Sequence, residues 1–154
     1  MKKFLLTALF LFIGVPTAYA SHYDLYDIDL VPEAVVDQLA AAKITNTEQL
    51  LANLMKKSDR DAFSKKYAIP EADVDKLARK LELMQVVGIG PKAAELLILA
   101  GVTGLKQLSE ANDSDLLETL QMVNRQHNIT GVQPDLTVVR DWIAKSKKIA
   151  NHIQ

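Results

Sequence analysis

The chain has 154 residues, enough for one domain or for two small ones packed together. It contains no cysteine, which excludes disulfides, thiolate catalysis, thiolate metal sites and a lipid attached through an N-terminal cysteine. Its 18 basic and 19 acidic residues give a net charge of −1, so the overall charge indicates neither a polybasic nucleic-acid binder nor an acidic tail.

The first twenty residues have the three parts of a secretory signal peptide. Two lysines precede an apolar run over residues 4–15, and the segment closes on Ala18-Tyr19-Ala20, an A-x-A cleavage site. The run is about twelve residues long, whereas a membrane span needs roughly twenty, and Pro16 ends it. We therefore expect residues 1–20 to be removed on export and the mature chain to contain no membrane span. A short signal and no cysteine suit a bacterial protein that is periplasmic or secreted.

The mature chain predicts almost only helix. Residues 21–30 alternate weakly and stand alone, so we expect an extended lead-in there. Downstream, prolines 32, 70 and 91 lie at or just before helix starts, where a missing N–H costs nothing. Thr45, Ser58 and Asp113 are the expected N-caps, and Glu48 would complete a capping box with Thr45. The expected helices cover residues 33–42, 47–56, 59–66, 71–84, 91–100, 104–110, 113–124 and 135–151. Trp142 belongs to the apolar stripe of the last one and is expected in the core.

Charge and residue patterns indicate an internal repeat. Net charge alternates −5, +3, −4, +3 over residues 21–52, 53–80, 81–124 and 125–154. The segment AKITNTEQLL, starting at Ala42, aligns with AGVTGLKQLS at an offset of 58, and an apolar helical pattern precedes each. The prolines before these patterns are 59 positions apart, so the alignment needs a slip of one residue there.

These observations predict an all-α fold of two diverged tandem units, residues 31–85 and 86–154, packed as one compact helical domain. We expect the acidic half of one unit to lie near the basic half of the other, because the alternating charges attract.

The segment VVGIGPKAAELL, starting at Val86, carries the most specific motif. Its G-x-G-x-x-A spacing also satisfies the dinucleotide-binding fingerprint, but that motif needs a preceding strand within a βαβ unit, and the residues before it have helical spacing. The segment resembles instead the helix-hairpin-helix motif, hydrophobic-Gly-hydrophobic-Gly-x-x-x-Ala. Val87 and Ile89 would point inward, Gly88 and Gly90 would allow a tight turn with positive φ, and Ala93 would allow close helix packing.

Residues 28–150 as a whole resemble a bacterial family built of such units, domain of unknown function 4332. In helix-hairpin-helix proteins, hairpin N–H groups and the next helix N-terminus bind a nucleic-acid phosphate without reading sequence. The resemblance thus implies a phosphate or DNA-backbone site at Gly88, Gly90 and Lys92. Two features oppose it: the first unit has LVPEA, without glycine, at the equivalent place, and residues 81–124 carry a net charge of −4. The alternative is a structural corner with Lys92 on the solvated surface.

No other pattern indicates chemistry. His22, His127 and His152 lack the spacing of metal ligands, and no serine–histidine–acid arrangement is evident. The sequence therefore predicts no catalytic, cofactor or metal site. The densest basic cluster is expected to form a solvated face or to dock an acidic partner; it comprises Lys56, Lys57, Arg60, Lys65 and Lys66.

The sequence thus predicts an exported, non-catalytic binding module whose partner is another protein, in an interaction or scaffold role in the periplasm. The alternative is non-specific binding to the DNA backbone through the Gly88–Gly90 hairpin, as in DNA uptake.

Overall fold

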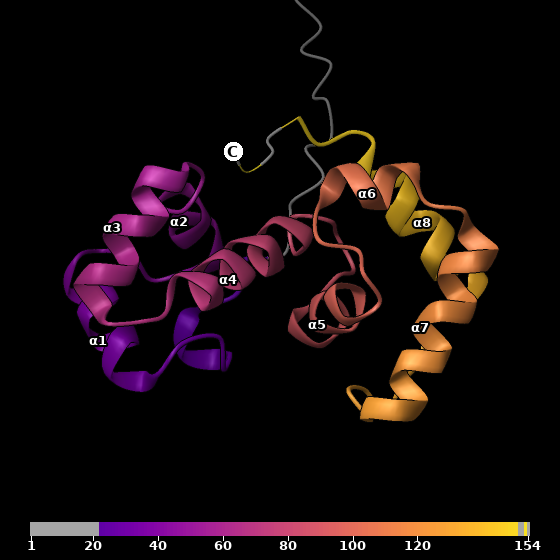
Figure 1. The fold of residues 1–154 in the computed structure, drawn as a ribbon, viewed down its shortest axis with the longest axis horizontal. Helices are drawn as coiled ribbons and strands as arrows, with labels where there is room; N and C mark the ends of the chain where they lie inside the picture. The colour runs from indigo at the N-terminus through magenta and orange to yellow at the C-terminus, as the bar shows by residue number, and fades with distance from the viewer. Residues whose placement is uncertain (1–21, 151–152, 154) are drawn as a thin grey trace, which may run out of the picture.

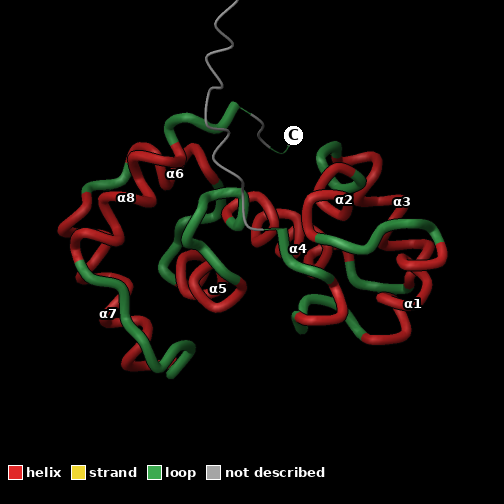
Figure 2. Tube along the Cα trace, turned by 180° about the vertical axis from the view of Figure 1, so that it is seen from behind, coloured by secondary structure: helices red, strands yellow, loops and turns green. Residues whose placement is uncertain are grey.

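The computed structural model describes residues 22–150 and 153, and these confirm the all-α prediction (Figures 1 and 2). The predicted signal peptide, residues 1–20, and His152 lie outside the described residues. A 3-10 helix, η1 (Leu25–Asp27), precedes eight α-helices in the described chain: α1 (Glu33–Ala41), α2 (Thr47–Ala52), α3 (Lys57–Tyr67), α4 (Glu71–Leu83), α5 (Pro91–Leu99), α6 (Leu105–Glu110), α7 (Asp113–His127) and α8 (Leu136–Ser146). In Figure 1, α4 lies between a group formed by α1 to α3 and a group formed by α5 to α8.

The helix starts follow local side-chain chemistry, and the three predicted N-caps are wrong by one or two positions. Asn46, not Thr45, caps α2: its Oδ1 accepts from the Gln49 N–H at 2.9 Å. The Gln49 side chain in turn accepts from the Thr45 N–H at 2.8 Å, so Gln49 rather than Glu48 reaches back across the start of the helix, to the residue before the cap. Asn112, not Asp113, caps α7, and α3 begins after Lys56 without a side-chain cap.

Three helix ends differ from the sequence prediction by three residues or more. Helix α2 stops at Ala52, four residues early, because the Arg60 guanidinium donates to the carbonyl oxygens of Leu54 and Met55 at 3.0 and 3.1 Å and holds them in a turn. Helix α7 runs three residues further, to His127, and ends where Asn128 adopts a left-handed conformation. Helix α8 ends at Ser146, after which the chain turns.

The internal repeat is evident in the backbone. Helices α1 and α5 begin 58 residues apart, and so do α2 and α6. Left-handed residues occur at Lys43 and Gly101, again 58 apart. The bond from the Thr45 N–H to the Gln49 side chain recurs from Thr103 to Gln107, at 2.7 Å. No slip is needed, and that expectation was wrong, because Pro32 is the N-cap of α1 whereas Pro91 follows the N-cap of α5.

Two hydrophobic clusters form the interior. The first is built by η1, α1 to α3 and α4 as far as Leu81, and the second begins at Leu83 and includes α5 to α8. Trp142 is buried in the second cluster, as predicted. Ile28 and Leu30 of the lead-in pack against both clusters. Helix α4 and the lead-in therefore join the two groups of helices.

The lead-in is held by backbone hydrogen bonds and is not extended throughout. The Leu25 N–H donates to the Thr45 oxygen at 2.9 Å, and the Thr47 N–H donates to the Tyr23 oxygen at 3.0 Å. These bonds fix the segment against the loop between α1 and α2, and the chain then turns into η1. The backbone bonds of the lead-in are thus made to the first group of helices, while Ile28 and Leu30 also reach the second cluster.

Candidate functional site

The turn between α4 and α5 contains the predicted site residues Gly88 and Gly90. Gly88 has a φ of 97°, which confirms the predicted positive φ in this segment. Gly90 is the N-cap of α5 with an extended backbone, and Pro91 occupies the first helical position. Ile89 is fully buried, whereas Val87, also expected inside, is only half-buried. Val86 takes the second buried position.

The small residue that allows close packing of α5 is Ala94, one position after the predicted Ala93. Ala94 is fully buried in the second cluster, whereas Ala93 is half-buried and lines a surface groove. A larger side chain at position 94 would meet the core directly.

Side chains from distant parts of the chain cover this turn. A Cβ added to Gly88 would lie 3.2 Å from Trp142 Nε1, and one added to Gly90 would lie 3.1 Å from the Tyr23 hydroxyl. The Lys145 ammonium donates to the Val87 carbonyl oxygen at 3.3 Å. Gly88 is therefore favoured by its left-handed backbone as well as by its close neighbour, whereas a side chain at Gly90 would require only a small shift of Tyr23.

Lys92 lies exposed on the first turn of α5, beside a group of opposite charges that joins α4 to α5. Lys80 donates to the Glu95 carboxylate, and Lys76 lies 3.8 Å from it. The hydrogen bond from Lys80 holds the pKa of Glu95 below its ordinary value of 4.5, and the charges of Lys76 and Lys92 act in the same direction. The structure thus brings Gly88, Gly90 and Lys92 together in one turn, with a carboxylate close by.

An apolar groove of about 220 Å³ lies beside this turn, and we call it the hairpin groove. The turn, α5, α8 and the loop before α8 form its walls. Leu96 and Trp142 are the two buried residues among those that line it. Val132, at the rim, is 84% exposed. The lining residues are Gly88, Ala93, Leu96, Thr130, Val132, Gln133, Pro134, Val138 and Trp142.

The loop before α8 is shaped by one buried side chain of α7. The Asn124 amide donates to the Thr130 oxygen at 2.9 Å and accepts from the Thr130 N–H at 2.9 Å. The Thr130 hydroxyl also bonds to the backbone of Val132, which places Val132 at the groove rim. Ser64 has the corresponding role in the first group, where its hydroxyl donates to the Ile69 oxygen at 2.6 Å.

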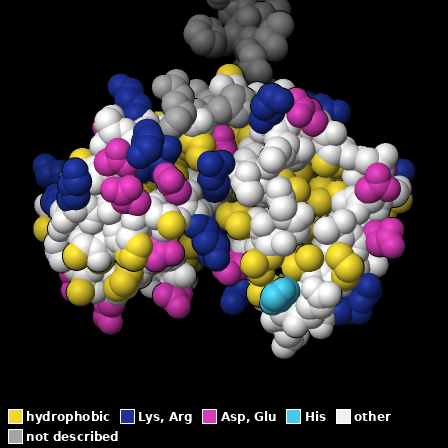
Figure 3. All heavy atoms as spheres, viewed as in Figure 1, with side chains coloured by type: hydrophobic (Ala, Val, Ile, Leu, Met, Phe, Trp, Pro, Cys, Tyr) yellow, Lys and Arg dark blue, Asp and Glu magenta, His cyan; other side chains and the backbone are white. Residues whose placement is uncertain are grey.

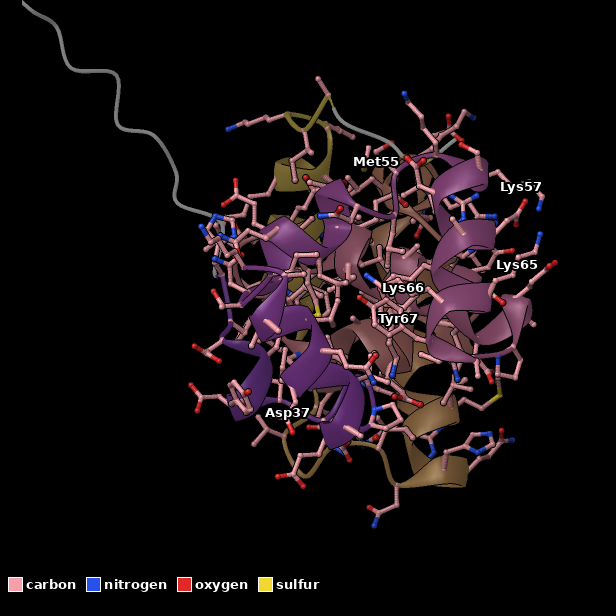
Figure 4. The ribbon with its side chains drawn as sticks, turned by 90° about the vertical axis from the view of Figure 1, so that its left-hand side faces the viewer. Asp37, Met55, Lys57, Lys65, Lys66 and Tyr67 are labelled. Carbon is pink, nitrogen blue, oxygen red and sulfur yellow. The ribbon has the colours of Figure 1, made fainter. Side chains whose placement is uncertain are left out.

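The predicted basic face on α3 is only partly a surface. Arg60 is buried and bonded to Asp75 at 2.6 Å as well as to the end of α2. Lys57 pairs with Asp61. Figure 4 shows Lys57 and Lys65 on the outer side of α3 and Lys66 beside Tyr67, whose ring centroid lies 5.0 Å from the ammonium. The cluster therefore does not form one continuous cationic surface.

Among the described residues, no group of three or more His, Cys, Asp or Glu side chains is arranged to hold a metal ion. His22 lies 3.3 Å from Glu48, and His127 is exposed at the end of α7. No helix in this part of the chain is both long and apolar enough to cross a membrane.

Fold and site together define an all-α tandem helical module with a surface groove beside a glycine turn. The family model "Domain of unknown function (DUF4332)" matches residues 31–149, and the chain belongs to this family. No curated protein and no solved structure matches the chain.

Proposed function

We propose that this protein is an exported binding module that captures an apolar segment of another protein in the hairpin groove. Four of the five large hydrophobic side chains that are exposed in the described chain belong to α5, α7, α8 and the loop before α8: Leu99, Met122, Val132 and Val138. On the face shown in Figure 3, hydrophobic side chains gather over these helices, whereas α1 to α3 present more charged ones.

The observation that carries the proposal is the composition of the groove. Its lining contains no charged side chain, and its rim residue Val132 is almost fully solvated. Exposed apolar side chains around a concave apolar surface are typical of a protein-interaction site. The Gln133 amide at the same rim supplies a polar group that can orient a peptide backbone.

Trp142 makes this proposal directly measurable, because it is the only tryptophan in the chain and lines the groove. A photo-crosslinking residue at position 132, introduced in the producing cell, should trap a partner protein, whereas the same residue at Ala68, on the loop between α3 and α4, should not. The purified partner should then shift Trp142 fluorescence, and Val138→Asp should abolish the shift. A partner that binds without changing Trp142 fluorescence, or equally well to Val138→Asp, would contradict the assignment.

The second candidate, non-specific binding to the DNA backbone, is supported by exposed Lys92 and by the free N–H groups expected at the first turn of α5. Glu95 and the Tyr23 hydroxyl against Gly90 oppose it. In a mobility-shift assay with duplex DNA at low salt, we expect no more binding than an unrelated acidic protein shows. A shift that Lys92→Glu removes would establish DNA binding instead.

Export is proposed from the signal sequence and has its own test. Mass spectrometry of the exported protein should find Ser21 as the first residue. A mature chain that still begins at Met1 would exclude cleavage.

A further inference from the structure

A second groove, formed by the lead-in and α1, has a different chemistry from the hairpin groove. It measures about 370 Å³ and has apolar walls of Leu25, Ile28, Val31 and Val36. Tyr26 also lines it and is 58% exposed, although it is a large aromatic side chain. We call this the lead-in groove.

Carboxylates surround these apolar walls. Asp27, Asp29 and Glu33 line the groove directly. Asp37 accepts the Tyr26 hydroxyl at 2.9 Å, and Asp24 accepts the Tyr26 N–H at 2.9 Å.

No described lysine or arginine forms an ion pair with any of these five carboxylates. Residues 22–42 contain no basic residue apart from His22. Figure 4 shows Asp37 on α1, away from Lys57 and Lys65 on the outer side of α3. No ion pair from the described residues therefore offsets the negative charge of the groove.

We infer that the lead-in groove binds a lysine- or arginine-rich segment of a partner protein. The apolar walls suit the methylene stems of such side chains, and the carboxylates suit their cationic ends. The exposed face of Tyr26 adds a cation–π partner. A nucleic acid is excluded by charge, and the described carboxylates are not arranged to hold a metal ion. This surface is separate from the hairpin groove, and a protein with both would bridge two partners.

The test measures binding of a fluorescent eight-residue peptide of alternating lysine and leucine, and of the same peptide with glutamine replacing lysine. Fluorescence anisotropy at low salt would compare the wild type with Tyr26→Ser and with the double variant Asp29→Asn/Glu33→Gln. The matched control is Asp115→Asn/Glu118→Gln, which removes the same charge from exposed positions of α7, one of them in its first turn. Circular dichroism would verify that each variant is folded.

We expect the lysine peptide to bind the wild type and the glutamine peptide to bind much more weakly. The groove double variant and Tyr26→Ser should each weaken binding about tenfold, and Tyr26→Phe should restore it, whereas the α7 control should stay within about twofold. Equal loss in the α7 control would show attraction by net charge alone and overturn the inference. So would no binding, or wild-type self-association that the groove variants abolish, because a second copy would then be the occupant. Val138→Asp should leave this binding unchanged, which separates it from the hairpin groove.

Discussion

Tyr26 combines an exposed ring with a hydroxyl that is held by a carboxylate. Its hydrogen bond to Asp37 raises the pKa of Tyr26 above 10.0, and the charges of Asp37, Asp24 and Glu33 act in the same direction, because a phenolate would face three negative groups. We predict that Asp37→Asn moves the pKa of Tyr26 down toward 10.0, as measured by NMR titration of the tyrosine ring. Asp73→Asn, which removes an exposed charge at the start of α4, should leave the Tyr26 titration unchanged. An unaltered Tyr26 pKa in Asp37→Asn would mean that the hydrogen bond is absent in solution.

Single residues also show what a sequence leaves open. Trp142 could be assigned to the core from its helical stripe, because burial along a helix follows apolar spacing. Arg60 could not be separated from its lysine neighbours, because only the tertiary structure brings Asp75 and the end of α2 to its guanidinium. The exposure of Tyr26 and Val132 could not be predicted from the sequence. Both lie in segments outside the α-helices, and hydrogen bonds to other parts of the chain or within the loop determine the backbone conformation there.

Helices α4 and α5 are joined by the Glu95 group, and this connection should depend on pH. Because the pKa of Glu95 is lowered in the fold, its stabilising contribution is present above its ordinary value of 4.5 and is lost as pH falls through the lowered value. The side chain is 30% exposed, so the contribution is about 1 kcal/mol at most.

We predict that Glu95→Gln is less stable than the wild type in urea unfolding at neutral pH and that the difference disappears below the lowered pKa. Glu118→Gln, which removes an exposed carboxylate without an ion pair in the described chain, should show no such pH dependence. A constant difference between wild type and Glu95→Gln at all pH values would mean that the loss has another cause.

The turn between α4 and α5 depends on Gly88 for two separable reasons. Its φ of 97° is strained for other residues, and a Cβ added at this position would lie only 3.2 Å from Trp142 Nε1. We predict that Gly88→Val lowers the free energy of unfolding by about 2 kcal/mol or more, because left-handed backbone alone costs about 1–2 kcal/mol. Gly101→Val has the backbone strain without a neighbour within 4 Å and should cost less. Gly131→Val has neither and should cost about 0.5 kcal/mol or less. Equal losses at all three positions in urea unfolding would refute this ranking.

At the scale of elements, helix existence could be predicted and helix ends could not. Periodicity and the three prolines located all eight α-helices of the described chain, because amphipathic spacing and proline at helix starts are local properties. Caps and ends depend on which of two adjacent polar residues reaches a free N–H, as with Asn46 and Thr45. The end of α2 depends on Arg60, which is provided by the next helix.

At the scale of the molecule, both grooves lie beyond what the sequence could indicate. The hairpin groove joins residues 88–96 to residues 130–142, and only the packing of α5 near α8 brings these together. The glycine motif located only the turn that forms one wall of the hairpin groove. The resemblance to helix-hairpin-helix proteins directed attention to phosphate, whereas the structure surrounds the same turn with Trp142, Val138 and Tyr23.

The two hydrophobic clusters share α4 and the lead-in, and this sharing determines how the molecule unfolds. The Ile153 N–H also donates to Glu82 of α4 at 3.0 Å, which ties the C-terminal end to the same helix. We predict that the described chain unfolds in one cooperative transition. Helix α4 supplies residues to both clusters, so the unfolding of one cluster removes packing that holds α4 in the other. Leu50→Ala, deep in the first cluster, should cost about 2–5 kcal/mol.

Trp142 reports the second cluster alone, so urea unfolding followed by its fluorescence tests this coupling. In Leu50→Ala, the fluorescence midpoint should fall together with the midpoint from circular dichroism, although Leu50 and Trp142 belong to different clusters. Leu108→Ala, equally buried in the second cluster, is the matched control and should move both midpoints as well. If Leu50→Ala leaves the Trp142 transition in place while circular dichroism becomes biphasic, the two groups of helices unfold independently.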